Sequence, residues 1–222
     1  MIAVIPARYQ SSRFPGKPLV LISGLPLVVH VFKKVEQVFD RSQIFVATDD
    51  ERIQRKCLEF GIQVRMTSNQ CLTGTDRVYE AIQPLAEETI ISVQGDEPLV
   101  HPDDIRTVVR AKEKHNEYII NAMCAIDDRK DIESPNVPKV VVNEMDDLVY
   151  MSRAPIPFLK ARNVKVSYFR QVCIYGFNRG QLKSFCERGC KSAIEEPEDI
   201  EILRFLDLGI GIKMVRVKQL SV

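Results

Sequence analysis

The sequence predicts an α/β protein with a doubly wound, mostly parallel sheet that helices cover on both faces. Two observations carry this prediction. Short apolar runs alternate four times with amphipathic helical patterns before residue 116, and this alternation is typical of parallel βαβ units. The predicted helix ends also fall where a doubly wound sheet needs its loops. With 222 residues, of which 45% are hydrophobic and 27% are charged, the chain is long enough to bury a sizeable core.

The first half of the chain contains four predicted pairs of strand and helix. Apolar residues at spacings of three and four predict a helix over 27–39 with one wide apolar face. Asp50 can cap the next helix and Gly61 can end it. Pro102 suits the first turn of the fourth helix. The predicted strands are 2–6, 44–48, 62–67 and 89–93, and the predicted helices are 27–39, 51–60, 76–85 and 102–114.

After residue 116, strand-like segments follow one another with proline-rich or polar connections between them. The segment SRAPIPF, 152–158, holds too many prolines for a central strand and predicts an edge or an arm. We find no internal repeat and no linker, so we expect one domain, 1–222, with an inserted sub-structure at about 117–178. The predicted strands of this half are 118–126, 139–142, 148–152, 172–177 and 211–217, and the helices are 179–187 and 195–208.

Charge and composition exclude several classes of partner. The formal net charge is +1, so no overall field draws the chain to nucleic acid or to an acidic membrane. No apolar run approaches the roughly 18 to 20 residues of a membrane span. The start, MIAVIPAR, does not resemble a secretory signal, and six cysteines without such a signal indicate reduced thiols. We expect a cytoplasmic protein that binds neither nucleic acid nor membrane.

The segment ARYQSSRFPGK, from Ala7 to Lys17, is the strongest candidate for a binding site. It follows the first predicted strand, combines small residues with Arg8, Arg13 and Lys17, and contains no acid. Small residues let backbone N–H groups turn inward around an anion, and the cations supply charge. The alternative is a solvated basic surface loop. Because ligands of such sheets sit outside the carboxyl ends of the strands, the position favours binding of a polyphosphate.

Two more strand ends carry candidate chemistry. Gln94, Gly95, Asp96 and Glu97 follow the fourth strand, and a carboxylate beside a phosphate loop suits Mg²⁺, which prefers hard oxygen ligands. The loop 73–77, TGTDR, mixes hydroxyls with a glycine and suits the edge of a nucleobase. Taken alone, the first could be a polar turn and the second a capped helix start. No histidine lies near these motifs as a general base, so we expect metal activation of the nucleophile.

Seven motifs, in order, resemble those of one family. They are IPARYQSSRFPGKPL, VATDD (46–50), MTSNQCLTGTDR (66–77), VQGDEP (93–98), SRAPIPF (152–158), RQVCIYGF (170–177) and IEEPEDIEILRFLDLG (194–209). Over essentially the whole chain they are similar to the 3-deoxy-manno-octulosonate cytidylyltransferases, the CMP-KDO synthetases. The sialic-acid cytidylyltransferases are more distant relatives.

This resemblance implies a Rossmann-like nucleotide-diphospho-sugar transferase fold. It implies transfer of CMP from CTP to the anomeric hydroxyl of an acidic keto sugar, with Mg²⁺ as cofactor and release of pyrophosphate. The product would serve the synthesis of lipopolysaccharide or another cell-surface polysaccharide. The resemblance also implies a homodimer, with the inserted region and its SRAPIPF arm near the interface.

The resemblance further implies roles for individual residues. Arg153 is the expected partner of the sugar carboxylate, because its fork can bind two oxygens. The catalytic residues would be Lys17, Asp96 and Arg13, with Asp96 as the metal ligand. The nucleotide-binding positions are Arg8, Ser11, Arg13, Lys17, Thr73 and Gly74. The positions that line the sugar-acid pocket are Gln94, Arg153, Tyr175, Glu198 and Glu201.

The chain departs from the family at three positions expected on the sugar side. Cys71 and Gln171 stand where the family usually has histidine, and Ile202 stands where it usually has glutamine. Each departure changes hydrogen-bonding capacity. The acceptor could therefore be another keto-sugar acid, amino-substituted or deoxygenated near Ile202, and neutral drift is the alternative.

The chain also stops before a segment of the type VDTPEDL, whose aspartate is the second metal ligand in the family. Three explanations stay open: a truncated sequence, a substitute carboxylate such as Glu195 or Glu198, and a crippled metal site. The leading function is the CTP-dependent enzyme. The competing ones are a catalytically weak CTP-binding homologue and a cytidylyltransferase for a sialic-acid-like nonulosonate.

Overall fold

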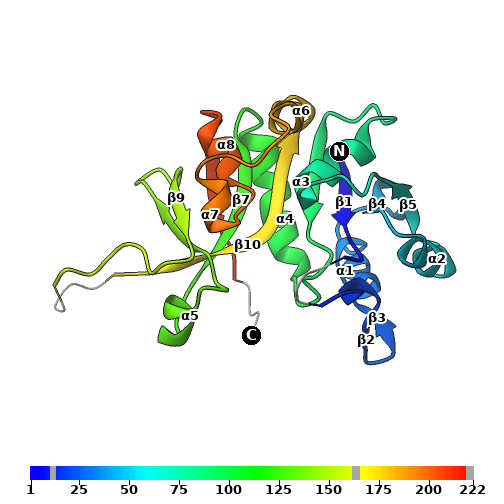
Figure 1. The fold of residues 1–222 in the computed structure, drawn as a ribbon, viewed down its shortest axis with the longest axis horizontal. Coiled ribbons are helices and arrows are strands. Elements are labelled where there is room, and N and C mark those ends of the chain that lie inside the picture. Colours follow the sequence, from blue (N-terminus) through cyan, green and yellow to red (C-terminus); the bar gives the residue numbers. More distant parts are fainter. Residues whose placement is uncertain (11–13, 162–165, 219–222) are drawn as a thin grey trace.

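One mixed sheet organises the fold (Figure 1). This computed structural model describes residues 1–10, 14–161 and 166–218. The main path of the sheet runs β11-β7-β10-β6-β1-β4-β5. In that order these strands are Ile212–Arg216, Ile119–Ala125, Phe169–Asn178, Thr89–Val93, Ile2–Pro6, Ile44–Thr48 and Gln63–Met66. The helices are α1 Leu27–Val35, α2 Glu51–Glu59, α3 Gly74–Ile82, α4 Pro102–Lys114, α5 Arg129–Glu133, α6 Arg179–Glu187, α7 Glu195–Glu198 and α8 Leu203–Asp207.

The pairing of the strands confirms the predicted, mostly parallel sheet. β1 runs parallel to both β4 and β6, and β4 runs parallel to β5. The carboxyl ends of these four strands therefore meet at one edge. β10 alone on the main path runs antiparallel, between β6 and β7, and its register places Ile174 beside Val93. The first half of β10 thus lies at the same edge as the end of β6.

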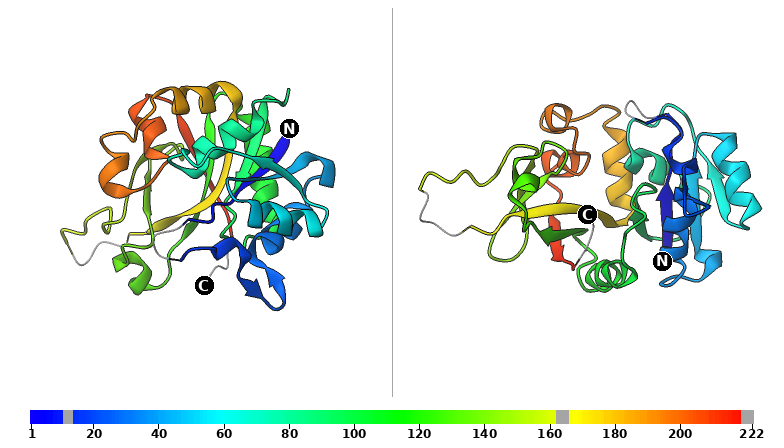
Figure 2. Two further views of the ribbon diagram at one scale, coloured as in Figure 1. Left: turned by 45° about the vertical axis from the view of Figure 1, so that its right-hand side comes forward. Right: turned by 90° about the horizontal axis from the view of Figure 1, so that it is seen from below.

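Helices cover both faces of this sheet, because the strands are apolar on both faces (Figures 1 and 2). Successive side chains of a strand point to opposite faces. In β1, Ala3 and Ile5 accordingly belong to one core cluster, and Ile2 and Val4 belong to the other. The first cluster joins the sheet to α1, α2 and α4, and the second joins it to α3, α6 and α8. A sheet buried on both faces leaves its strand ends as the place for a site.

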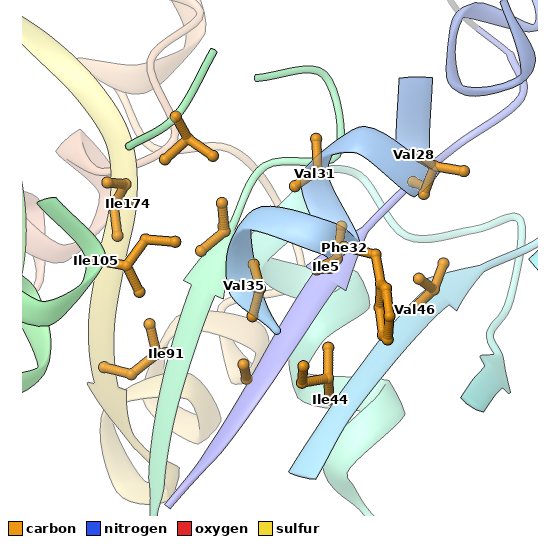
Figure 3. Close-up of a cluster of buried hydrophobic side chains, with 14 of the residues drawn as sticks. Ile5, Val28, Val31, Phe32, Val35, Ile44, Val46, Ile91, Ile105 and Ile174 are labelled. Atoms are coloured by element: carbon orange, nitrogen blue, oxygen red, sulfur yellow. The ribbon is translucent and has the colours of Figure 1, made fainter. Parts of the chain in front are cut away.

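The predicted amphipathic pattern at the start of 27–39 is the buried face of α1. Val28, Val31 and Phe32 are at most 2% exposed and pack over Ile5 and Ile44 of the sheet (Figure 3). The helix ends at Val35, earlier than predicted, and the chain turns before the 3-10 helix Arg41–Gln43.

Short elements connect the main strands. The hairpin of β2, Leu21–Ile22, and β3, Leu25–Pro26, and the short helix α5 are additions that the hydrophobic pattern did not predict. A 3-10 helix, Lys17–Leu19, follows the predicted anion loop.

The region predicted as an insertion, 117–178, is bounded by strands of the main sheet. β7 and β10 pair with each other along most of their length. The hairpin of β8, Lys139–Val142, and β9, Leu148–Ser152, attaches to the start of β10. The segment after β9 projects from the body as the predicted arm (Figures 1 and 2), and Phe158 on it is 85% exposed.

The predicted helix over 195–208 is wrong, because two short helices replace it. Asp199, between them, has a φ of 50°, which lies in the left-handed region that interrupts a helix. The side chains of Glu198 and Glu201 bond to different parts of the protein, β9 and α3. These tertiary contacts override the helical pattern.

Lys112 of α4 is a fully buried cation among neutral acceptors. Its Nζ donates to the backbone oxygens of Asn116 and Tyr118 at 2.7 Å and to Gln181 Oε1 at 3.2 Å. Burial lowers the pKa of Lys112 from 10.5 to about 8. The amine therefore loses its proton in the folded protein at a pH where the unfolded chain still holds it.

The free energy of unfolding should rise with pH because of Lys112. Between about pH 8 and 10.5 the unfolded state binds more protons, so the gain approaches about 1.4 kcal/mol per pH unit. Urea unfolding of wild type and Lys112→Met across this range measures it. The difference between the two proteins should change with pH above about 8 and be constant below it. A difference that stays constant throughout contradicts the assignment.

Among the described residues, we find no helix with the length and apolarity that a bilayer crossing demands.

Candidate active site

A cavity of about 770 Å³ opens at the carboxyl edge of the sheet. Its walls come from the loops after β1 and β6, the start of α3, the first half of β10 and the segment that contains α7 and α8. Predicted site residues that line it are Arg8, Lys17, Thr73, Gly74, Gln94, Asp96, Arg153, Tyr175 and Glu201. The fold thus brings together residues that the sequence distributes over nearly 200 positions.

Lys17 and Asp96 face each other across the ends of β1 and β6. Lys17 Nζ lies 2.8 Å from Asp96 Oδ2, and the two side chains are 40% and 50% exposed. An ion pair so open to water contributes little to stability. Both side chains line the cavity and are open to solvent. The predicted partners Ser11 and Arg13 lie outside the described residues.

Gly95 allows the two strand ends to approach each other. A Cβ at this position would come within 2.7 Å of the backbone oxygen of Pro6. The backbone N–H of Gly95 donates to that same oxygen at 3.1 Å. Close approach of the two backbones therefore requires glycine here.

The anion loop is anchored on α2 through its tyrosine. The guanidinium of Arg52 lies 3.3 Å from the ring centroid of Tyr9, an arrangement that favours a cation–π attraction. Asp50 accepts hydrogen bonds from Arg52 Nε and Nη2 and holds it there. The hydrogen bond from Arg52 lowers the pKa of the Asp50 carboxyl. Arg8, next to Tyr9, is exposed and lines the cavity.

The start of α3 forms the opposite wall and is a capped helix, one of the alternatives for this motif. Thr73 Oγ1 accepts from the backbone N–H of Asp76, and Asp76 Oδ2 accepts from the backbone N–H of Thr73. The backbone of Gly74 packs against the side chain of Gln94, which a Cβ at position 74 would approach to 2.8 Å. Thr73 and Gly74 also line the cavity, where they were predicted to bind nucleotide.

Glu201 joins this wall to the end of β6. Its Oε1 accepts from Gln94 Nε2 at 2.8 Å, and its Oε2 accepts from the backbone N–H of Thr75 at 3.1 Å. Burial raises the pKa of the Glu201 carboxyl, and the N–H of Thr75 and the hydroxyls of Thr73 and Thr75 oppose the rise. Both oxygens that we expected at the sugar are thus bonded by the protein.

Arg153 and Glu198 hold the base of the arm against α7. Arg153 Nε and Nη2 donate to the backbone oxygens of Glu198 and Asp199, and Nη1 donates to that of Pro135 at 2.8 Å. The Glu198 carboxylate accepts from Ser152 Oγ at 2.6 Å and from the backbone N–H of Arg153 at 2.8 Å. Arg153 lines the cavity, whereas Glu198 is not among the described residues that do. The structure therefore places Glu198 outside the expected pocket.

The first half of β10 forms the floor. Tyr175 is 2% exposed, and burial raises the pKa of its phenol well above the ordinary value. Gln171 Nε2 donates to Asn121 Oδ1 at 3.0 Å and contacts Tyr175 Oη at 3.4 Å. The thiol of Cys173 also lines the cavity, and burial raises its pKa as well. Sequence reasoning missed Cys173, which lies between two predicted positions on the same strand.

Only one of the three family departures faces this cavity. Gln171 lines the floor. Ile202 is 1% exposed and packs in the core that includes α8, so its expected place on the sugar side is wrong. Cys71 lines a second pocket of about 300 Å³ and donates to Glu80 Oε2 at 3.2 Å. Burial, with a contribution from Glu80, raises the pKa of this thiol to about 12.

Lys191 and Asp199 form a further charged pair on the cavity wall. Their side chains are 2.8 Å apart. The hydrogen bond from Lys191 lowers the pKa of the Asp199 carboxyl. Nothing in the sequence pattern signalled this pair, because the break in the predicted helix brings Asp199 to the wall.

The carboxylates suggested as substitute metal ligands are committed elsewhere. Glu195 is 1% exposed and accepts from Arg204 Nε and Nη2 at 2.6 and 2.7 Å. Glu198 is bonded by β9 as described above. In residues 1–10, 14–161 and 166–218, no group of three or more His, Cys, Asp or Glu could hold a metal ion. Asp96 is an exposed carboxylate in the cavity, and Mg²⁺ commonly takes one or two carboxylates together with substrate phosphates and water, so the site fits this metal.

The fold and the cavity together define a nucleotide-binding α/β enzyme that handles phosphate groups. Comparisons with known proteins narrow this class. A family model described as cytidylyltransferase matches residues 2–214. The chain belongs to this cytidylyltransferase family.

Individual relatives agree with this assignment. A 3-deoxy-manno-octulosonate cytidylyltransferase of Parabacteroides distasonis is 38% identical over 96% of this chain and 88% of its own length. A 3-deoxy-manno-octulosonate cytidylyltransferase of Escherichia coli is 36% identical over 97% of this chain and 87% of its own length. A solved structure of a CMP:2-keto-3-deoxy-manno-octonic acid synthetase complexed with CTP superposes with a TM-score of 0.89 at 36% identity, over 97% of this chain and 89% of that one.

Proposed function

We propose that this protein transfers CMP from CTP to the anomeric hydroxyl of 3-deoxy-manno-octulosonate or a close relative, with release of pyrophosphate. The observation that carries the proposal is the pair of Lys17 and Asp96 at the mouth of a cavity large enough for a nucleotide and a sugar acid. The names of the relatives that align over nearly the whole chain support the same reaction. The product would serve cell-surface polysaccharide or lipopolysaccharide synthesis.

The residues at the strand ends would bind the triphosphate. Phosphoryl and nucleotidyl transfer depend on positioning and on neutralising charge rather than on covalent catalysis. Lys17 and Arg8 supply fixed cations in the cavity, and Ser11 and Arg13 are predicted to add to them. When ligand binds, Lys17 can exchange its contact with Asp96 for a phosphate oxygen. Thr73 and Gly74 would lie beside the cytosine.

Asp96 would hold Mg²⁺. When bound, this ion neutralises charge on the triphosphate and lowers the pKa of the attacking hydroxyl. The carboxylate is exposed, and Lys17 is its partner at 2.8 Å, so a small movement of the lysine side chain frees its oxygens.

The other side of the cavity would bind the acceptor. Within the described residues, three of the five N–H groups of Arg153 bond backbone oxygens, which leaves one on Nη1 and one on Nη2 for a sugar carboxylate. Gln94 and Tyr175 line the cavity and would bond sugar hydroxyls. Gln171, also on the floor, is the residue that could change sugar preference. Glu198 supports this side indirectly by holding Ser152 and Arg153.

Replacing Arg153 by alanine should raise KM for the sugar acid about 10- to 100-fold, since a charge-assisted bidentate contact contributes about 1.5 to 3 kcal/mol. KM for CTP should change less than about threefold. Steady-state kinetics with each substrate varied in turn measures both. Arg153→Lys is the matched control, because it keeps the charge and loses the fork. Equal effects on the two KM values contradict the assignment.

Pyrophosphate release from CTP with Mg²⁺ tests the proposed function. The expected result is release that depends on 3-deoxy-manno-octulosonate, with little or none when UTP or GTP replaces CTP. Turnover with a panel of other keto-sugar acids, including nonulosonates, shows whether this enzyme, which has Gln171, prefers a different acceptor. Calorimetric binding of CTP with no release for any acid would instead support the non-enzymatic, CTP-binding homologue.

We also infer that the enzyme works in the cytoplasm as a homodimer. The arm supports the second part of this inference, because Phe158 and its neighbour Leu159 are both exposed, and adjoining exposed apolar side chains mark interaction surfaces. Light scattering measures the mass in solution, and a monomer would refute this part.

A further inference from the structure

One carboxylate, that of Glu201, connects three separate elements of the cavity wall. It lies in the turn between α7 and α8 and bonds the side chain of Gln94 after β6 and the backbone of Thr75 in the first turn of α3. The partners are 107 and 126 residues away along the chain. This contact is the meeting point of the nucleotide half and the acceptor half of the cavity.

The side chain of Gln94 is confined on two sides. Its Nε2 donates to Glu201 Oε1 at 2.8 Å, and the backbone of Gly74 lies against it so closely that no Cβ fits at position 74. In the described part of the chain, Gln94 Oε1 accepts no hydrogen bond, and the residue lines the cavity. An ionised carboxylate can only accept hydrogen bonds. Glu201 therefore requires the NH₂ group of Gln94 on its own side.

We infer that Glu201 is a positioning residue, which orients the amide of Gln94 so that its carbonyl oxygen accepts a hydrogen bond from a hydroxyl of the acceptor sugar. The inference rests on the proposed function and assigns Glu201 a role other than direct sugar binding. An amide oxygen suits this task, because it accepts a hydrogen bond from a hydroxyl, whereas the NH₂ group of the flipped amide can only donate. Through Thr75, the same carboxylate keeps the nucleotide wall in place beside the acceptor.

A second contact allows this role to be separated from a structural one. Arg204 Nη1 lies 3.2 Å from Asp76 Oδ1, so the start of α3 is also tied to α8 independently of Glu201. Exchanging the Glu201 carboxylate for an amide should therefore leave the fold intact. It should act mainly on the orientation of Gln94.

The variant Glu201→Gln tests the inference. Its amide can accept from Thr75 with its oxygen only if its NH₂ group points to Gln94, which must then turn its own oxygen toward it. KM for the sugar acid should rise about tenfold, as expected for one hydrogen bond to the substrate lost, while KM for CTP stays within about threefold. A thermal midpoint that falls together with an equal rise in both KM values would show a merely structural role.

Exchanging the two side chains provides the rescue. In the double variant Gln94→Glu with Glu201→Gln, the amide at position 201 donates to the carboxylate at position 94. The second oxygen of that carboxylate then faces the sugar again. We expect KM for the sugar acid in the double variant to be at least about fivefold lower than in Glu201→Gln. The effects of neighbouring groups in one hydrogen-bond network are not additive, so the second substitution can compensate for the first. No recovery overturns the inference.

Wild-type turnover keeps this test separate from that of the function. Absence of pyrophosphate release by the wild type with 3-deoxy-manno-octulosonate refutes the proposed function alone. Nuclear magnetic resonance of the substrate-free protein then decides the inference. One side-chain amide proton of Gln94, bonded to the carboxylate, should resonate downfield in the wild type and return to the ordinary range in Glu201→Gln. An unchanged amide signal overturns the inference whatever the turnover.

Discussion

Replacing Lys17 by alanine should lower kcat about 10²- to 10³-fold, the range observed when one preorganised group at a developing charge is removed. Lys17 lies at the end of the anion loop, 2.8 Å from Asp96 and 40% exposed, so the side chain can be removed without leaving a hole in the core. Single-turnover measurement of pyrophosphate release gives the rate. The thermal midpoint should stay within about 2 °C of wild type, because an exposed ion pair adds little stability.

Asp96→Asn belongs to the same prediction and should lower kcat by a similar factor. The two side chains meet in one contact and would serve one substrate group, so their effects should not add. The double variant Lys17→Ala with Asp96→Asn should be at most about tenfold slower than the slower single variant. Lys33→Ala, an exposed lysine on α1 that does not line the cavity, is the charge-matched control and should retain normal turnover. A Lys17→Ala enzyme with a near-normal rate would remove this residue from the mechanism.

The largest effect on stability should come from Arg204. This side chain is fully buried, bonds Glu195 through two nitrogens at 2.6 and 2.7 Å, reaches Asp76 and lies 3.7 Å from the centroid of the Phe185 ring. Arg204→Met fills the space but leaves the Glu195 carboxylate buried without its cation. Breaking a buried pair in this way costs about 3 to 5 kcal/mol. For a chain of this size the thermal midpoint should fall by about 10 °C.

The companion variant separates charge from packing. Glu195→Gln combined with Arg204→Met removes both charges and should recover more than half of the lost free energy of unfolding, since neutral replacement of a whole buried pair is often tolerated. Urea unfolding at pH 7 measures both variants. If Arg204→Met alone unfolds like the wild type, the pair has no stabilising role. Glu195 is then also no longer excluded as a metal ligand by its partner.

Local patterns predicted most strands and several helices well. The bounds of β4, β6, β8, β9, α4 and α6 match the prediction to the residue. Each of these elements has a clear apolar pattern, and residues that end a helix or strand stand on both sides of it. Local preference and tertiary packing therefore agree. Lys17 and Asp96 could be brought together from sequence because both follow parallel strands, whose ends meet at one edge.

The segment that contains α7 and α8 could not be predicted to the same depth. A continuous helix over 195–208 would carry Glu195, Glu198 and Ile202 along one face. The left-handed conformation of Asp199 turns the chain, so that Glu195 meets Arg204, Glu198 meets the arm and Ile202 enters the core. Two of the contacts that hold this turn join residues far apart in the sequence, with 46 positions between Ser152 and Glu198 and 126 between Thr75 and Glu201. No local pattern encodes such contacts.

With the roles proposed above, β10 adds acceptor residues from a later stretch of the gene than the one that supplies the triphosphate residues. Lys17 and Asp96, which we propose for the triphosphate, precede residue 100, as does Gln94, whereas Gln171 and Tyr175, which we propose for the acceptor, lie on the strand that follows the arm. Mutations in this later stretch would then change which sugar is activated. They would leave Lys17 and Asp96, and with them the cleavage of the nucleotide, unchanged. Glu201 bonds both Gln94 and Thr75, which lie in the earlier stretch. A chimera of two related enzymes should therefore take Thr75, Gln94 and Glu201 from the same parent.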